Sequence, residues 1–407
     1  MKRSKLFMMV ASLMAVTVLA AACGGEDEPA APGDDNAGPD KIPVTLYFQG
    51  ALSGPYSYLI TPSFQGAQIK VDELNADDSF PAEITLLEAD SQGDPEKAPP
   101  VVQEAVGDPN TVGIIGPGFS GESEASGDTY NENQIPFVSA SATATSLGEK
   151  GWDFWYRAVG NDAGQGGFAG QFIAETLKPA SVYVAHDKSD YGQPLAEEVL
   201  KVAGEGGVEE AGFQGVEAGA DDYSALVSDL EASGAEAMFF GGYDADFGKI
   251  VKQARDEGVE IPLMSGDGSL SSTFLELAGD GADNVNLIAP TNISGDFIET
   301  YNSEVGGDAS SVPVYAAEGY DVAGLFGEGI KAAIDGGAED ATAIRAGIKE
   351  YLDSLVPGSE YQGAAKPYAF DDVHELAADD IAELFFIYEV QGGELTSLGS
   401  AAELFGS

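Results

Sequence analysis

The sequence predicts a doubly wound α/β fold, in which helices pack on both faces of a mostly parallel sheet. Short apolar runs alternate along the chain with stretches whose apolar residues recur at helical spacing, and this strand–helix–strand order is typical of that class. A length of 407 residues suggests two or three domains at roughly 150 residues each. The hydrophobic content of 43% is enough to build sizeable cores, so we expect a folded, soluble protein.

The apolar runs are expected to form buried parallel strands, because a strand covered on both faces reads as a near-continuous apolar segment. In chain order these runs are residues 44–48, 84–87, 112–115, 136–139, 181–185, 237–240, 261–264 and 285–289. The stretches with helical spacing are residues 64–76, 95–106, 121–133, 164–177, 191–205, 222–232 and 244–257.

Polar and aromatic residues follow several of the predicted strands. In doubly wound sheets, ligands bind outside the carboxyl ends of the strands, so these residues are the first candidates for a site. They are Ser53, Asp90, Ser120, residues 139–143, Asp187, Tyr243 and Asp267.

The first forty residues resemble an export signal followed by a tether. Basic residues precede an apolar run at positions 7–22, which is the layout of a secretory signal peptide and is short for a membrane-spanning helix. Residues 20–23 resemble a bacterial lipobox ending in Cys23, although the usual leucine stands one position early; a free thiol is the alternative. We expect a signal peptide at 1–22, a lipidated Cys23 and a flexible acidic tether through residue 40.

The charge of the chain excludes whole classes of partner. With 18 Lys and Arg against 69 Asp and Glu, the formal net charge is −51, which would repel nucleic acids and anionic lipid headgroups. One cysteine and two histidines exclude an internal disulfide framework and leave little for a metal centre. We therefore expect no cofactor and no metal, and we interpret the acidity as a solubility device.

A glycine-rich turn at residues 116–121 satisfies G-x-G-x-x-G between a predicted strand and helix. A dinucleotide site would also need an acidic residue at the end of the next strand, but residues 136–143 end in Ser, Ala and Thr. The turn instead favours an anion such as a carboxylate at the helix N-terminus, or it is only a tight turn.

Two further strand ends offer complementary groups. Residues 139–143 place three hydroxyls among small residues, which could donate to a carboxylate or could simply cap the next segment. Asp267 follows another strand and would suit an ammonium group, or it is a turn aspartate.

A Ser-His-Asp hydrolase site is not supported. Glu122 stands where G-x-S-x-G requires glycine, and the adjacent residues His186 and Asp187 cannot readily orient one another as base and support. We expect no enzymatic activity.

Taken together, the motifs resemble the type I periplasmic binding proteins, close to the leucine/isoleucine/valine-binding proteins that serve ABC importers. The resemblance runs from about residue 41 to residue 398. It rests on these stretches: residues 50–55, 115–120, 137–145, 157–160, 186–192 and 239–243.

The resemblance implies two doubly wound α/β lobes joined by a three-crossing hinge, with an amino acid enclosed between them. Ser120, Ser141 and Thr143, with neighbouring backbone amides such as that of Ala142, would hold the carboxylate, and Asp267 would hold the ammonium group. Tyr191 and Tyr243 would close over the ligand. The branched-chain binders carry glutamate where this chain has Asp267, and their first-lobe aromatic residue falls near Leu59, with Tyr56 and Tyr58 beside it, so the side-chain pocket is not assigned.

The resemblance also implies the role of the protein. We expect an extracytoplasmic, lipid-anchored monomer that captures an amino acid with a branched-chain or other apolar side chain for the permease and ATPase of an ABC importer. The expected lobes are residues 41–160 with 290–376 and residues 161–289 with 377–407. A ligand-sensing module for a receptor, or a binder of amides or aromatic acids, remains the alternative.

Overall fold

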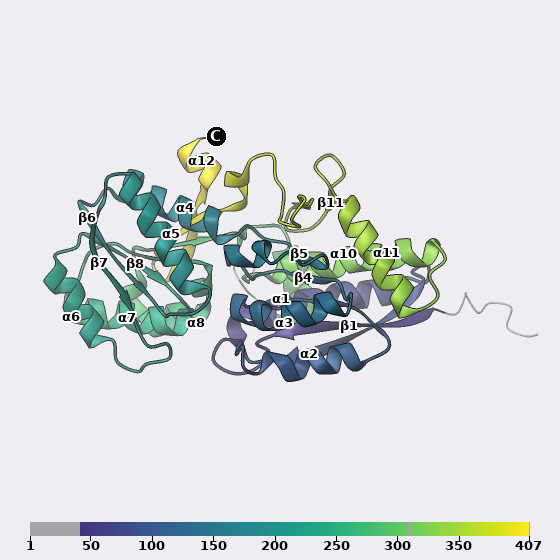
Figure 1. Cartoon of the computed structure of the whole chain (residues 1–407). Coiled ribbons are helices and arrows are strands. Elements are labelled where there is room, and N and C mark those ends of the chain that lie inside the picture. Colours follow the sequence, from purple (N-terminus) through teal and green to yellow (C-terminus); the bar gives the residue numbers. More distant parts are fainter. Residues whose placement is uncertain (1–40, 308, 310, 312, 407) are drawn as a thin grey trace, which may run out of the picture. The chain divides into compact units, whose positions relative to one another are not determined.

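Two sheets organise the chain in the computed structural model, which describes residues 41–307, 309, 311 and 313–406 (Figure 1). These residues belong to one compact unit. The predicted signal peptide, Cys23 and the tether lie outside the described residues.

The first sheet has five parallel strands in the order β2-β1-β3-β4-β5. Their bounds are Ile42–Gly50 for β1, Ala82–Asp90 for β2, Thr111–Ile115 for β3, Phe137–Ser139 for β4 and Trp155–Arg157 for β5. The helices that pack around it are α1 (Ser57–Ala76), α2 (Ala98–Gly107), α3 (Ser120–Glu132), α10 (Ala316–Asp335) and α11 (Ala341–Ser354).

Helices cover both faces of this sheet, as alternate residues of β1 show. Leu46 and Phe48 belong to the core that includes residues of α1 and α10, whereas Tyr47 between them belongs to the core that includes residues of α2 and α3. This alternation is the period of two that a strand imposes, and it is what a doubly wound sheet requires.

The second sheet has seven strands in the order β14-β13-β10-β9-β8-β6-β7. The bounds are Ser181–His186 for β6, Glu209–Gly215 for β7, Ala237–Gly241 for β8, Leu263–Ser265 for β9, Val285–Ala289 for β10, Phe386–Gln391 for β13 and Glu394–Ser400 for β14. Strands β6 to β10 are parallel, and β13 and β14 add an antiparallel hairpin at one edge.

The remaining elements surround the second sheet or connect the two sheets. Those of the second sheet are α4 (Asp162–Phe172, continued by a π-helical turn Ile173–Leu177), α5 (Gly192–Glu205), α6 (Ser224–Ser233), α7 (Asp244–Asp256), α8 (Ser272–Ala278) and α12 (Ala401–Phe405). The others are α9 (Ile298–Val305), β11 (Tyr361–Gln362), β12 (Pro367–Tyr368) and the short 3-10 turns at Thr145–Glu149, Asp267–Ser269, Gly279–Ala282 and Ile381–Leu384.

The chain passes between the two groups of elements three times. The first passage follows β5 and leads to β6 of the second sheet. The second follows β10 and leads to helices α9 to α11, and the third follows β12 and leads to β13 of the second sheet. The predicted α/β class is confirmed, and every predicted strand and helix has a counterpart in the structure.

Three predictions about the strands and helices need correction. Strand β2 is not buried on both faces: it is an edge strand whose side chains alternate in exposure, and Leu87 is 37% exposed. Helix α1 begins at Ser57, earlier than predicted, because the polar residues and Pro62 of its first turns hide the helical spacing. Strands β5 and β7 were not predicted, since β5 is very short and β7 is a polar edge strand, and neither were helices α8 to α12 and strands β11 to β14.

Helices α1 and α10 cross closely at two glycines, so a larger side chain at either position should destabilise the fold. A Cβ on Gly66 would lie 2.0 Å from the carbonyl oxygen of Ala316, and a Cβ on Gly319 would lie 2.0 Å from that of Ser63. Both obstacles are backbone atoms, so Gly66→Ala must push the helices apart. We expect a loss of about 1–3 kcal/mol in the free energy of unfolding, measured by urea denaturation.

Gly167→Ala is the matched control, because Gly167 also lies within a helix but a Cβ there meets no atom within 4 Å. This variant should gain roughly 0.5–1 kcal/mol from the lower flexibility of its unfolded chain. Equal stability of the two variants would contradict the close crossing.

Candidate ligand-binding site

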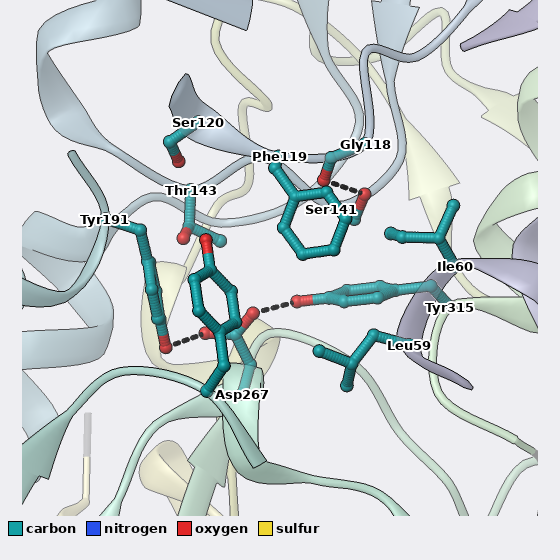
Figure 2. Close-up of a pocket in the computed structure, with 11 residues that line it drawn as sticks. Leu59, Ile60, Gly118, Phe119, Ser120, Ser141, Thr143, Tyr191, Asp267 and Tyr315 are labelled. Carbon is teal, nitrogen blue, oxygen red and sulfur yellow. Dashed lines mark hydrogen bonds between the residues drawn. The ribbon is translucent and has the colours of Figure 1, made fainter. Parts of the chain in front are cut away.

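A small cavity of about 20 Å³ lies where ends of both sheets meet within the compact unit (Figure 2). This volume has room for about one water molecule, so a ligand of amino-acid size would need the lining residues to move apart. Its lining residues are Leu59, Ile60, Gly118, Phe119, Ser120, Ser141, Thr143, Tyr191, Tyr243, Asp267 and Tyr315.

One side of the cavity carries hydroxyl groups from the ends of β3 and β4. The Ser120 hydroxyl accepts a hydrogen bond from the Ala144 N–H at 3.1 Å, so its own proton is available to a ligand. The Ser141 hydroxyl donates to the Gly118 carbonyl at 2.8 Å. The Thr143 hydroxyl is buried and has no hydrogen-bond partner among the described residues. Ser120 and Thr143 can therefore donate to an anionic ligand, whereas Ser141 has already used its proton.

Arg157 holds the backbone of this hydroxyl-bearing segment. Its guanidinium donates to the carbonyl of Ala142 at 2.6 Å and to that of Ala144 at 2.9 Å. It also forms a bidentate ion pair with Glu375, with two N···O distances of 2.8 Å. Asn161 donates to the same carboxylate at 3.1 Å. These contacts thus tie the hydroxyl-bearing segment to the connection after β5 and to the connection after β12, two of the three between the sheets.

The N-terminus of α3 is partly occupied by a side chain of its own helix. Glu122 accepts hydrogen bonds from the Phe119 N–H at 3.1 Å and from the Ser91 hydroxyl. Burial raises the pKa of Glu122 to about 7, while these hydrogen bonds oppose the shift. The predicted anion site at this helix end is corrected accordingly: the internal carboxylate takes part of the helix terminus, and the Ser120 hydroxyl is the group that faces the cavity.

Asp267 lies on the opposite side of the cavity, between Tyr191 and Tyr315 (Figure 2). Its carboxylate accepts hydrogen bonds from Gln165 Nε2 at 2.7 Å, from the Tyr191 hydroxyl at 2.8 Å and from the Tyr315 hydroxyl. The Tyr191 hydroxyl in turn accepts from the Gly268 N–H at 3.1 Å. Burial raises the pKa of Asp267, and the three donors oppose that shift.

Asp267 forms no ion pair with any lysine, arginine or histidine in the part of the chain that the structure describes. A buried carboxylate without a cationic partner is costly, and its neighbours here are neutral donors. The arrangement is therefore suited to receive a cationic group from a ligand.

An apolar wall connects the two polar sides. The Tyr243 ring lies 5.1 Å from the Tyr56 ring, 5.3 Å from the Phe119 ring and 5.3 Å from the Tyr191 ring, measured between centroids. Leu59 and Ile60, on the first turn of α1, complete the wall. A ligand held by its polar ends would place an apolar side chain against these residues.

Most of the residues predicted for a site lie around this one cavity. Those that line it are Leu59, Ser120, Ser141, Thr143, Tyr191, Tyr243 and Asp267. Tyr58 does not: its side chain is 60% exposed and lines a different cavity with Pro62 and Leu270. Ala142 is buried but is not among the lining residues, and its N–H and carbonyl are engaged by Ser139 and Arg157.

Tyr315, Ile60 and Phe119 line the cavity but were not predicted from the sequence. Tyr315 precedes α10, and neither a strand end nor a motif marks it in the sequence. Phe119 stands inside the glycine-rich turn, where only its backbone was considered. Ile60 differs from Leu59 by one helical position, and only the rotation of α1 shows that both face the cavity.

Two features are absent from the described residues. No group of three or more His, Cys, Asp or Glu side chains in that part of the chain could hold a metal ion. No helix within the described range combines the length and apolar character needed to cross a membrane.

Comparisons with known proteins agree on one family. A family model described as "Periplasmic binding protein" matches residues 43–382. The chain is 29% identical over 318 residues to the leucine-, isoleucine-, valine-, threonine-, and alanine-binding protein of Pseudomonas aeruginosa, covering 76% of this chain and 84% of that one. It is 30% identical over 244 residues to the Leu/Ile/Val-binding protein of Escherichia coli, covering 60% of this chain and 66% of that one.

Solved structures share the fold at lower identity. The branched-chain amino acid transporter substrate binding protein LivJ from Streptococcus pneumoniae, in complex with isoleucine, superposes with a TM-score of 0.75 at 23% identity, over 89% of this chain and 99% of that chain. A solute binding protein from R. palustris, in complex with benzoate, has a TM-score of 0.75 at 16% identity, over 89% and 96% of the two chains. The family model matches most of this chain, residues 43–382, and this match shows that the chain belongs to the periplasmic binding protein family.

Proposed function

We propose that this protein captures an amino acid with an aliphatic side chain and delivers it to an ABC importer. The observation that carries the proposal is the placement of neutral hydroxyl donors and an unpaired buried carboxylate on opposite sides of one cavity. A zwitterion presents the complementary groups, a carboxylate at one end and an ammonium group at the other.

The charge of Asp267 argues against a ligand that is only a carboxylic acid. Such a ligand would bring a second anion beside a buried carboxylate that has no cationic partner among the described residues, which is costly. A benzoate-binding structure shares the fold, so aromatic acids stay an alternative that a binding experiment must address.

The apolar wall favours an aliphatic side chain. Leu59, Ile60 and the rings of Phe119 and Tyr243 offer contact area without an unpaired charge. The relatives named for leucine, isoleucine and valine, and the structure with bound isoleucine, support the same ligand class.

Two lobes would close over this ligand. Residues 41–160 with 290–376 would form the first lobe and residues 161–289 with 377–407 the second, a division supported by the membership of the two sheets. The Tyr315 hydroxyl donates to Asp267 across this division, so the ligand site draws on both lobes. Ligand binding would shift an equilibrium between open and closed arrangements about the three connections.

The proposed cellular setting follows from the N-terminal sequence and the family. The signal-like residues 1–22 would direct export, and a lipidated Cys23 with the acidic tether would hold a monomer at the outer side of the cell membrane. The proposed partners are the permease and ATPase of an ABC importer; a receptor that senses the same ligand is the alternative. The proposed role involves no catalysis and no cofactor.

A binding screen tests the proposal with matched ligands. Residues 41–407 are titrated by calorimetry and heated in thermal-shift assays with leucine, with leucinamide, which lacks the carboxylate, and with 4-methylpentanoate, which lacks the ammonium group. We expect leucine alone to bind, and a concentration of 100 times its Kd should stabilise the fold by about 2.7 kcal/mol. Binding of 4-methylpentanoate or benzoate, but not leucine, would overturn the assignment of a zwitterion.

A further inference from the structure

A second buried carboxylate stands behind the proposed ammonium subsite. Asp162 begins α4, and Gln165 one turn later joins it to Asp267: Gln165 Nε2 donates to Asp162 Oδ1 at 3.0 Å and to Asp267 Oδ1 at 2.7 Å. Asp162 and Gln165 are 2% and 0% exposed. One amide group therefore bridges two buried carboxyl groups.

Three polar atoms of this cluster have no hydrogen-bond partner within the described residues: Asp162 Oδ2, Gln165 Oε1 and Thr143 Oγ1. Asp162 Oδ2 as a carboxylate oxygen and Gln165 Oε1 can only accept, so neither can satisfy the other. The Thr143 hydroxyl is a donor that faces Asp162 and opposes the rise in its pKa, but its single proton cannot satisfy both acceptors. A proton on Asp162 changes this, because the carboxylic O–H supplies a second donor to the cluster.

The charges around Asp162 point in the same direction. The charged and titratable groups that face it are Asp267, Arg157 and Tyr191. Arg157 directs its guanidinium to Glu375 and to two backbone carbonyls rather than to Asp162. The one nearby cation is thus paired with another anion, and two carboxylates would be left to share a buried site, which like charges resist.

The hydrogen bonds identify which of the two carboxyl groups is better suited to hold a proton. Asp267 accepts from three donors, Gln165, Tyr191 and Tyr315, and these stabilise it as an anion. Asp162 accepts one side-chain hydrogen bond with good geometry, from Gln165 at Oδ1, and the nearby Thr143 hydroxyl is the only other side-chain donor that stabilises its anion among the described residues. Burial, together with the charge of Asp267, raises the pKa of Asp162 well above its ordinary value.

We propose that Asp162 is a neutral carboxylic acid that positions Gln165 against Asp267, and that an ammonium ligand at Asp267 drives its proton into solvent. This inference rests on the proposed amino-acid binding function and adds a positioning residue to it. The O–H bond of Asp162 breaks, the proton passes to the buffer, and the ligand's positive charge compensates the new carboxylate.

The sign of the pH dependence follows from this linkage. A cation bound at Asp267 favours ionised Asp162, so the pKa of Asp162 is lower with ligand than without it. Binding therefore releases protons, and the association constant rises with pH, by up to about tenfold per pH unit for one proton released. The rise should occur above the pH range in which an ordinary aspartate titrates, because the pKa of Asp162 is raised.

Calorimetry of leucine binding to residues 41–407, in buffers of different ionisation enthalpy, measures the released protons directly. Wild type should show proton release, and Asp162→Asn should show none while binding leucine within about threefold of wild type at low pH, because the amide donates and accepts as the protonated acid does. Asp162→Ala, which leaves Gln165 unanchored, should bind about tenfold more weakly. Asp321→Asn changes another buried carboxylate that does not line the cavity and should retain the proton release.

The outcomes separate this inference from the proposed function. Leucine binding with equal proton release in wild type and Asp162→Asn would overturn the inference and leave the function standing, whereas absence of amino-acid binding would overturn both. A readout without ligand is the infrared band of protonated carboxyl groups at neutral pH. That band should be weaker in Asp162→Asn than in wild type, and an unchanged band would also overturn the inference.

Discussion

Replacing Asp267 with alanine is expected to weaken leucine binding by at least tenfold. The substitution removes the carboxylate that faces the cavity, so that tyrosine hydroxyls and the Gln165 amide surround the ammonium group of the ligand in place of its charged partner. Truncating one partner of a buried charge pair costs roughly 2 to 5 kcal/mol, which corresponds to about 30-fold or more in Kd. Titration calorimetry of residues 41–407 measures this change.

Two variants serve as controls for Asp267→Ala. Asp267→Glu keeps the charge and should bind at least about tenfold more tightly than the alanine variant. Tyr58→Ala should bind as wild type does, because the Tyr58 side chain is exposed and does not line the cavity. Unchanged affinity in Asp267→Ala would remove Asp267 from the site, and a loss in Tyr58→Ala would place the ligand elsewhere.

Replacing Arg157 with methionine should produce the largest loss of stability among these variants. The Arg157 side chain is fully buried, and its removal leaves Glu375 without its cationic partner and the carbonyls of Ala142 and Ala144 without their donors. Removing one partner of a buried ion pair costs about 3–5 kcal/mol. Urea denaturation of residues 41–407 measures the free energy of unfolding.

A double-variant cycle shows whether the pair itself is responsible. Arg157→Met combined with Glu375→Gln should be less destabilised than the sum of the two single variants, because no uncompensated charge remains. Lys252→Ala breaks an exposed pair with Asp256 and should change stability by less than about 0.5 kcal/mol. Additive losses, or a loss at Lys252 as large as that at Arg157, would contradict the role of the buried pair.

Much of the site could be predicted from the sequence because strand ends of parallel sheets converge. Ser120 and Thr143 follow neighbouring strands β3 and β4, and both line the cavity as their positions predicted. Asp267 follows β9, a strand recognised by its apolar run although its bounds are shifted by up to two residues. Alternating apolar and amphipathic stretches are local signals, and for this reason they determine the fold class and the strand that each candidate residue follows.

Local signals do not determine how a helix is rotated or which distant segments meet. Tyr58 and Leu59 are adjacent in sequence, yet successive residues of a helix point in directions about 100° apart, so Leu59 faces the cavity and Tyr58 faces outward. Tyr315 reaches Asp267 from a segment 48 residues away.

The sequence by itself determined the α/β class, the acidity that excludes polyanionic partners and most residues of the hydroxyl-bearing side. Only the tertiary structure decided that Arg157 pairs with Glu375, 218 residues further along the chain, and that Gln165 bridges Asp162 and Asp267. The physical reason is that these contacts depend on how the segments between the two sheets pack. That packing depends on contacts between segments far apart in the chain and leaves no periodic trace in the sequence.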